Sequence, residues 1–287
     1  MSNPVFDSSA IFRDPKKQRK QAQRGQQRGT VLQDSAVTAA PYDSTALNQM
    51  YQAPSATTAQ TGRMTYDDVI MKTSGLLMVV VVMAALTWFV VPDSSRMPLT
   101  LAGALIGFVL GMVNSFKKSP SPLLIVAYAA AEGVFLGGFS WFIEVQYALP
   151  GVVMQAVLAT MATFAACLVL FRSGRVRVTP KFTRWLLIAM VGYLVFSVLN
   201  VVLSFLSVGG DQMFGPLRGG TMGVLVGLFA VGLASAMLIV DFDSIKRGVE
   251  QGVPAKFAWT ASFGLVVTLV WMYLEFLRLI AILRGSN

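Results

Sequence analysis

The stretch SGLLMVVVVMAALTWFVVP occupies residues 74–92 and contains no charged side chain. It is long enough to cross a bilayer, because a hydrocarbon core about 30 Å thick requires roughly 20 apolar residues in a helix. Six more apolar runs follow, separated by short charged or Gly/Pro-containing connectors. The seven predicted spans are 74–92, 98–116, 122–143, 150–171, 184–206, 220–241 and 257–283. Hydrocarbon offers no partner to backbone N–H and C=O groups, so each span is predicted to be helical. We therefore predict an all-α polytopic membrane protein.

The basic residues of the chain are distributed unevenly around these spans. The formal net charge is +9, and 19 of the 23 Lys and Arg residues lie before the first span or in the connectors after spans 2, 4 and 6. The other side carries only Arg96, Arg218, Arg278 and Arg284. The positive-inside rule then predicts a cytoplasmic N-terminus and an exoplasmic C-terminus. Juxtamembrane Lys and Arg also attract anionic lipid head groups. Nucleic-acid binding explains this pattern less well, and we expect no nucleic-acid partner.

The N-terminal region differs in composition from the rest of the chain. Residues 1–63 are rich in Gln, Ser, Thr, Ala and basic side chains and poor in large apolar ones. Such a segment cannot bury enough surface to offset its ordering entropy, so we expect a disordered, basic cytoplasmic tail. Its polar start predicts no cleavable secretory signal. Residues 64–287 are predicted to form the seven-helix domain, beginning where Thr65 can cap the next turn and Asp68 supplies an acidic first turn.

Ionisable side chains inside the apolar runs are candidate functional residues, because each costs a few kcal/mol at a helix centre unless paired or hydrated. Glu132 lies about eleven residues into the third run, near the bilayer midplane. Glu275 lies in the seventh run, where Arg278 one turn later can neutralise it. Asp241 and Asp243 mark the expected end of the sixth run, where a solvated helix end is the alternative interpretation. The chain has no histidine, so sensing of pH between about 5 and 8 would depend on carboxylates.

The residue inventory argues against several enzyme classes. Without histidine, neither an H-E-x-x-H zinc site nor a serine–histidine dyad can form. The seventh run has no lysine for a retinal Schiff base, and no nucleotide-binding glycine loop occurs. We therefore expect no enzymatic activity and no cofactor. Cys167 is the only cysteine, which excludes an intramolecular disulfide and indicates a packing role.

Short connectors predict that consecutive helices are antiparallel neighbours in a compact bundle. Glycines recur at intervals of four residues in several runs, at positions 103, 107 and 111, at 133 and 137, and at 219, 223 and 227. Small residues at this spacing allow two helix backbones to approach closely. Helix packing is therefore their predicted role.

Three short motifs, taken in order, resemble the Bax inhibitor family in its bacterial YccA-like branch. They are Glu132-Gly133 in the third run, Asp241-Phe-Asp-Ser-Ile-Lys246 at the end of the sixth, and Tyr273-Leu-Glu275-Phe-Leu with Ile282-Leu283-Arg284 in the seventh. The resemblance covers about residues 65–285 and leaves the tail out. It implies six helices around a central seventh, in the plasma membrane, which is the inner membrane of a bacterium.

The resemblance also implies a pH-sensitive calcium leak, in which an acidic pair between the sixth and seventh helices acts as latch and sensor. Carried over by motif, this pair is Asp241 and Glu275, with Glu where the family usually has Asp, and the two are also the candidate calcium ligands. The interval between them, 34 residues, is about ten longer than the family pattern. Two straight helices that turn near residues 252–254 would place Asp241 level with Leu265. Glu275 would then lie about 15 Å deeper, and Glu132 is its alternative partner.

Two functions remain open from the sequence. The favoured one is a cation leak or transporter whose carboxylates bind Ca²⁺ or H⁺, since oxygen ligands suit calcium. The alternative is a non-conducting regulatory protein that binds a membrane protease through its tail and bundle, as the resemblance implies for relatives in this branch. Ion flux in liposomes discriminates between the two.

Overall fold

Seven long helices make up most of the computed structural model, which describes residues 62–174, 176, 178–206 and 214–285. They are α5 (Tyr66–Phe89), α6 (Asp93–Phe116), α7 (Pro122–Trp141), α8 (Val152–Arg172), α9 (Pro180–Phe205), α10 (Gly220–Glu250) and α11 (Ala258–Gly285). A π-helical turn, η2 (Phe142–Gln146), extends α7, and a 3-10 turn, η3 (Ala255–Phe257), precedes α11. All seven are long and apolar enough to cross a membrane, which confirms the predicted spans and the all-α fold.

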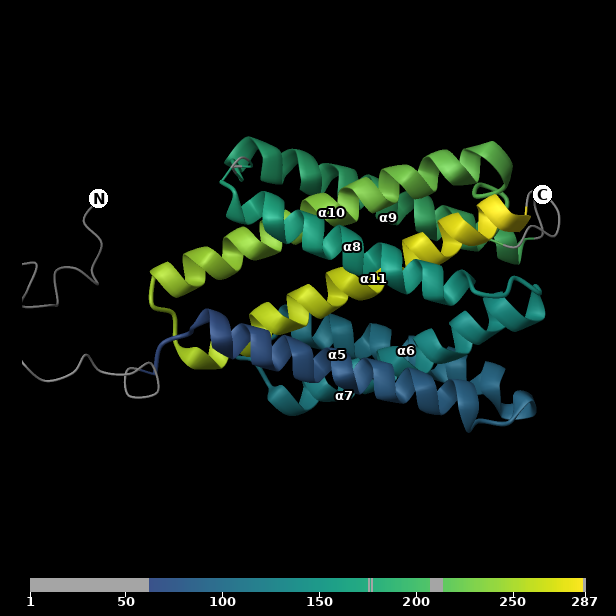
Figure 1. The fold of residues 1–287 in the computed structure, drawn as a ribbon, viewed down its shortest axis with the longest axis horizontal. Helices are drawn as coiled ribbons and strands as arrows, with labels where there is room; N and C mark the ends of the chain where they lie inside the picture. The colour runs from purple at the N-terminus through teal and green to yellow at the C-terminus, as the bar shows by residue number, and fades with distance from the viewer. Residues whose placement is uncertain (1–61, 175, 177, 207–213, 286–287) are drawn as a thin grey trace, which may run out of the picture. The chain divides into compact units, whose positions relative to one another are not determined.

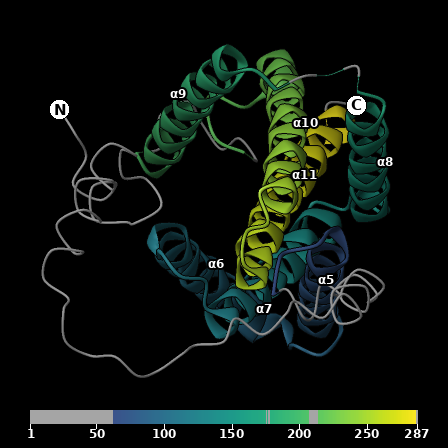
Figure 2. The ribbon, with the colours of Figure 1, turned by 90° about the vertical axis from the view of Figure 1, so that its left-hand side faces the viewer.

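The last helix lies between two groups of three helices. Figures 1 and 2 show α5, α6 and α7 on one side and α8, α9 and α10 on the other, with α11 crossing diagonally between them. α11 packs directly on α5, α7, α8 and α10, and its apolar window is the most buried of the seven. The predicted arrangement of six helices around a central seventh is therefore confirmed.

The first helix begins at the predicted residue. Thr65 Oγ1 accepts a hydrogen bond from Asp68 N (3.1 Å), and Asp68 Oδ2 accepts one from Thr65 N (3.2 Å), which completes a capping box. Such reciprocal bonds satisfy backbone donors that the first turn of a helix leaves without partners. The expected disorder over residues 1–63 lies outside the described residues, apart from positions 62 and 63.

The segment just before this cap is tied to the turn between α10 and α11. Met64 N donates to Val253 O (2.7 Å), and Ala255 N donates to Gly62 O (2.8 Å). The side chain of Met64 is buried against the same turn, with only 4 % of the residue exposed. We call residues 62–64 the strap, because they join the start of α5 to the α10–α11 turn.

Glycine allows α7 to approach α5 closely. A Cβ atom on Gly133 would lie 2.5 Å from Val80 O, and one on Gly137 would lie 2.4 Å from Ala84 O. Both distances are shorter than any real Cβ contact, so a larger residue would push the helices apart. The predicted packing role of these two glycines is confirmed.

α10 is longer than predicted. Its span was expected to end at Asp241, but the helix continues to Glu250. Beyond the apolar run, Arg247 Nη2 pairs with Asp243 Oδ2 at 2.9 Å, and a second ion pair lies one turn further on. Opposite charges four residues apart stabilise a helix in water. Asp241 and Asp243 therefore lie inside α10 rather than at its end.

Candidate functional site

One face of α11 carries four polar side chains, Thr268, Trp271, Glu275 and Arg278. Their spacings of three, four and three residues keep them on one side of a helix with 3.6 residues per turn. Early in the helix this face contacts α10, and later it contacts α9. We call it the polar face of α11, and it organises the candidate site.

Glu275 is buried, with 2 % of the residue exposed, and donors surround its carboxylate. Arg278 Nη1 forms an ion pair with Oε2 at 2.8 Å. The indole Nε1 of Trp271 donates to Oε1 at 3.1 Å, and the hydroxyl of Tyr193 on α9 donates to the same oxygen. The predicted neutralisation of Glu275 by Arg278 is therefore confirmed, and a buried charge is compensated where it lies.

Arg218 brings a second guanidinium group to this region from the segment between α9 and α10. Its Nη2 donates to Tyr193 Oη (2.9 Å) and to Ser197 Oγ (2.6 Å), and only 5 % of the residue is exposed. Asn200 holds the segment in place, because its Oδ1 accepts from Leu217 N at 2.9 Å. The Glu275 network, as we name it, consists of Glu275, Arg278, Trp271, Tyr193 and Arg218.

The sequence analysis missed Tyr193 and assigned Arg218 only to a connector. A usable signal was present in α9, where Tyr193, Ser197, Asn200 and Ser204 follow one another at spacings of four, three and four residues. A polar stripe on an otherwise apolar helix predicts a face directed toward the protein interior. Its partner, however, comes from a different helix and is not predictable from the stripe itself.

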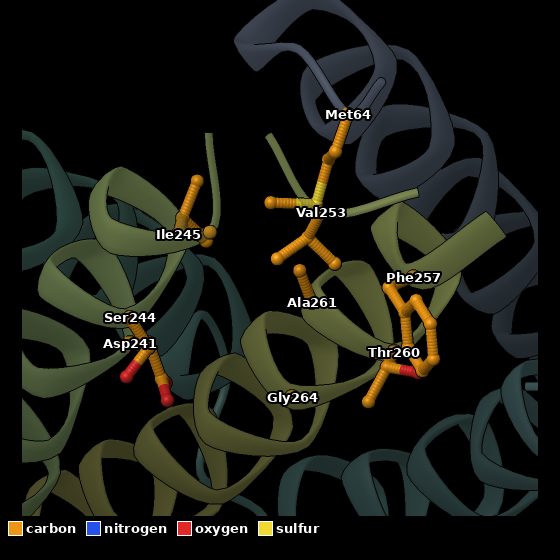
Figure 3. Close-up of a pocket in the computed structure, with 10 residues that line it drawn as sticks. Met64, Asp241, Ser244, Ile245, Val253, Phe257, Thr260, Ala261 and Gly264 are labelled. Atoms are coloured by element: carbon orange, nitrogen blue, oxygen red, sulfur yellow. The ribbon is translucent and has the colours of Figure 1, made fainter. Parts of the chain in front are cut away.

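Asp241 lies in a different environment, beside a pocket of about 310 Å³ between α10 and α11. Thr268 Oγ1 donates to Asp241 Oδ2 at 2.7 Å. Across the described residues, no ion pair reaches Asp241. Figure 3 shows the residues around the pocket. We call it the Asp241 pocket, and its lining consists of Met64, Asp241, Ser244, Ile245, Gly248, Val253, Phe257, Thr260, Ala261 and Gly264.

The structure does not bring Asp241 and Glu275 together. Asp241 is hydrogen-bonded to Thr268, which precedes Glu275 by seven residues, or about 10 Å along α11. Counting residues had placed Asp241 level with Leu265, one turn away from its observed partner. Asp243 is also separate from both, because it pairs with Arg247 on the outer part of α10.

Glu132 lies on α7 but is directed toward α6. Its Oε1 lies 3.0 Å from the position that a Cβ atom on Gly107 would take. The hydroxyl of Tyr128, one turn earlier on α7, faces the same carboxylate. The alternative prediction, that Glu132 is the partner of Glu275, is therefore wrong.

The reason is the direction in which side chains leave α11. The helix meets α7 through Tyr273, whose hydroxyl is hydrogen-bonded to Ser140 Oγ at 2.6 Å. Glu275, two residues later, projects about 200° around the helix from Tyr273 and therefore toward α9. The position of a side chain along its helix follows from the sequence, whereas its direction around the helix axis depends on how the helices pack.

Ca²⁺ takes about 6–8 oxygen ligands. Within the described part of the chain, no three His, Cys, Asp or Glu side chains are close enough to hold a metal ion. Asp241 offers one carboxylate beside one threonine hydroxyl, which is fewer oxygen ligands than a bound Ca²⁺ ion takes. Calcium binding by Asp241 and Glu275 stays a prediction.

Comparison with protein families gave one match along nearly the whole chain. A family model described as Bax inhibitor 1 like matches residues 3–285. The match extends into the N-terminal region, which the resemblance seen in the sequence had left out. A comparison with curated protein sequences gave no match.

Proposed function

This chain belongs to the Bax inhibitor 1 like family, and from that premise we propose that it is a pH-sensitive cation leak, with calcium as its substrate. In this proposal the Asp241 carboxylate lies at the entrance of the ion route, and the Glu275 carboxylate controls the gate. The proposal assigns the polar groups of the bundle to ion passage and therefore includes no catalytic activity. The family and the seven apolar helices support a membrane location.

The observation that supports the proposal most directly is the unpaired carboxylate in the Asp241 pocket. A cation 4 Å from a carboxylate gains about 4 kcal/mol where the effective dielectric constant is near 20. Asp241 has no basic neighbour in an ion pair among the described residues, so this attraction is available to an entering cation. Asp241 is therefore the proposed entrance.

The Glu275 network is the proposed gate, which blocks the passage of a cation along the polar face of α11. From Thr268 the polar face of α11 continues about 10 Å to Glu275. There Arg278 forms an ion pair with the Glu275 carboxylate, and Arg218 is hydrogen-bonded to Tyr193. The two guanidinium groups would repel an arriving cation. Protonation of Glu275 removes its attraction for Arg278. Acid conditions would then free Arg278 to move off the route, and its charge would no longer repel the cation there.

Calcium flux into liposomes that contain the purified protein tests this proposal. Wild-type flux should increase as the pH falls across the range from about 8 to 5, in which shifted carboxylates titrate. Glu275→Gln keeps the size of the side chain and removes its titratable charge, so flux should lose most of its pH dependence. Asp241→Asn should lower flux most at the upper end of this range, where a carboxylate is charged, whereas Asp243→Asn, outside the pocket, is the matched control and should conduct like wild type. Folded wild-type protein that shows no flux at any of these pH values would refute the leak.

A non-conducting regulator of a membrane protease is the second candidate. The full set of donors around Glu275 favours it, because a buried and compensated charge can serve stability alone. Absence of flux together with specific binding of a membrane protease to the full-length chain would select this function. The bilayer is the surrounding medium in either case.

The orientation in the membrane is also a proposal. We infer a cytoplasmic N-terminus and an exoplasmic C-terminus in the inner membrane of a bacterium. The strap and the α10–α11 turn lie together, and the basic residues near them, such as Lys72 and Lys256, suit the cytoplasmic side. Reporters fused to the two termini should therefore give opposite signals.

A further inference from the structure

Asp241 differs from the other acidic side chains of the second half of α10. Those side chains have basic partners one turn away, whereas the bonding partner of Asp241 within the described residues is the hydroxyl of Thr268. From this difference and from the shape around it, we propose that the Asp241 pocket binds a small amphipathic amine. The ammonium group pairs with the Asp241 carboxylate, and the apolar body of the ligand fills the pocket.

The pocket has the size and the walls that such a ligand requires. Its volume of about 310 Å³ lies at the lower end of the range for small-molecule sites, about 300–1,000 Å³. Met64, Ile245, Val253 and Phe257 supply apolar and aromatic surface (Figure 3). A single charged group on apolar walls orients a ligand that has one charged end.

The same composition argues against a metal ion as the resident ligand. Calcium needs several oxygen ligands, and the pocket offers few. The hydroxyl of Ser244 donates to Val240 O (2.8 Å) within its own helix. Thr268 donates to Asp241 Oδ2 and thereby holds the carboxylate in one orientation. An ammonium group can pair with this carboxylate through one of its three N–H donors and keep the others toward water, because Asp241 is only partly buried.

Titration calorimetry of the purified full-length protein in detergent tests the inference with a matched pair of ligands. The probes are 3-phenylpropylamine and 3-phenyl-1-propanol, which share size and shape and differ in charge. The amine should bind about tenfold more tightly than the alcohol, because a hydrogen bond between two charged groups is stronger than one from a neutral hydroxyl. Asp241→Asn should abolish this preference, whereas Asp243→Asn should retain it. Equal binding of both probes to wild type, or unchanged amine binding by Asp241→Asn, would overturn the inference.

A second variant separates loss of the site from loss of the fold. Gly264 lines the pocket, and a Cβ atom there would meet no atom within 4 Å, so the side chain of Gly264→Leu starts in open space and is designed to occupy the pocket. This variant should melt at or above the wild-type temperature, because Leu favours a helix more than Gly does, and it should lose amine binding. A stable Gly264→Leu protein that still binds the amine would place the ligand elsewhere. The inference concerns the same pocket as the proposed function, but calorimetry needs no ion flux, so either can fail alone.

Discussion

Glu275 belongs to the polar face of α11 and Asp241 is hydrogen-bonded to it, yet the surroundings of the two carboxylates are opposite. Glu275 is buried and accepts bonds from Arg278, Trp271 and Tyr193. Asp241 is partly exposed beside a pocket, where Thr268 donates to it. The contrast teaches that a carboxylate in a membrane helix has two different physical roles. One is compensated within the fold, and the other is available to a ligand.

The energetic cost of removing the carboxylate differs in size between the two environments. Removing one partner of a buried ion pair leaves an uncompensated charge, which is strongly destabilising. Removing an unpaired carboxylate from a pocket removes a desolvation penalty and costs only a hydrogen bond of about 1 kcal/mol. Stability measurements can therefore tell the two roles apart before any flux is recorded.

The largest effect is expected for Glu275→Leu. This change leaves Arg278 without its ion-pair partner, so the free energy of unfolding should fall by about 3 kcal/mol. Unfolding by SDS in mixed micelles measures it. The double variant Glu275→Leu/Arg278→Leu should recover part of the loss, and Asp241→Leu, the matched control, should stay within about 1 kcal/mol of wild type. Equal losses at Glu275 and Asp241 would abolish the distinction between them.

Met64→Ala should have the next largest effect, at the pocket end of the polar face. Met64 is nearly fully buried in the strap, and truncation of a buried Met to Ala costs about 2 kcal/mol or more. Because no hydrogen bond among the described residues joins Met64 to the Glu275 network, the double variant with Glu275→Leu should show additive losses in the same SDS titration. A coupling energy well above about 0.5 kcal/mol would show that the two ends act as one unit.

Much of this contrast was predictable from the sequence, because it depends on residues that are close together in the chain. Seven apolar runs specify seven helices because each must satisfy its own backbone. The pairing of Glu275 with Arg278 follows from their spacing of three residues on one helix. Residue counting alone separated Asp241 from Glu275, although it missed the level of Asp241 on α11 by one turn.

The failures concern contacts between distant parts of the chain. Tyr193 reaches Glu275 across 82 residues, and no local pattern specifies which helix lies opposite a polar stripe. The direction of Glu132 toward α6 was not predicted, because it depends on the rotation of α7 within the bundle. The predicted end of α10 came too early, because hydropathy detects only the apolar segment. Ion pairs between side chains four residues apart continue the helix beyond that segment.

The smallest effect is expected for removal of the N-terminal region, and it sharpens the comparison at the pocket end. A chain that starts at residue 62 retains the strap, with Met64 N bonded to Val253 O and Ala255 N to Gly62 O. The composition of residues 1–61 predicts little buried apolar surface, so the free energy of unfolding should change by less than about 0.5 kcal/mol. The control is a chain that starts at Thr65, which loses the strap and should fall by at least as much as Met64→Ala. A drop of that size already in the first truncation would show that residues before the strap pack against the bundle, and the pocket end would then owe its stability to more than the strap.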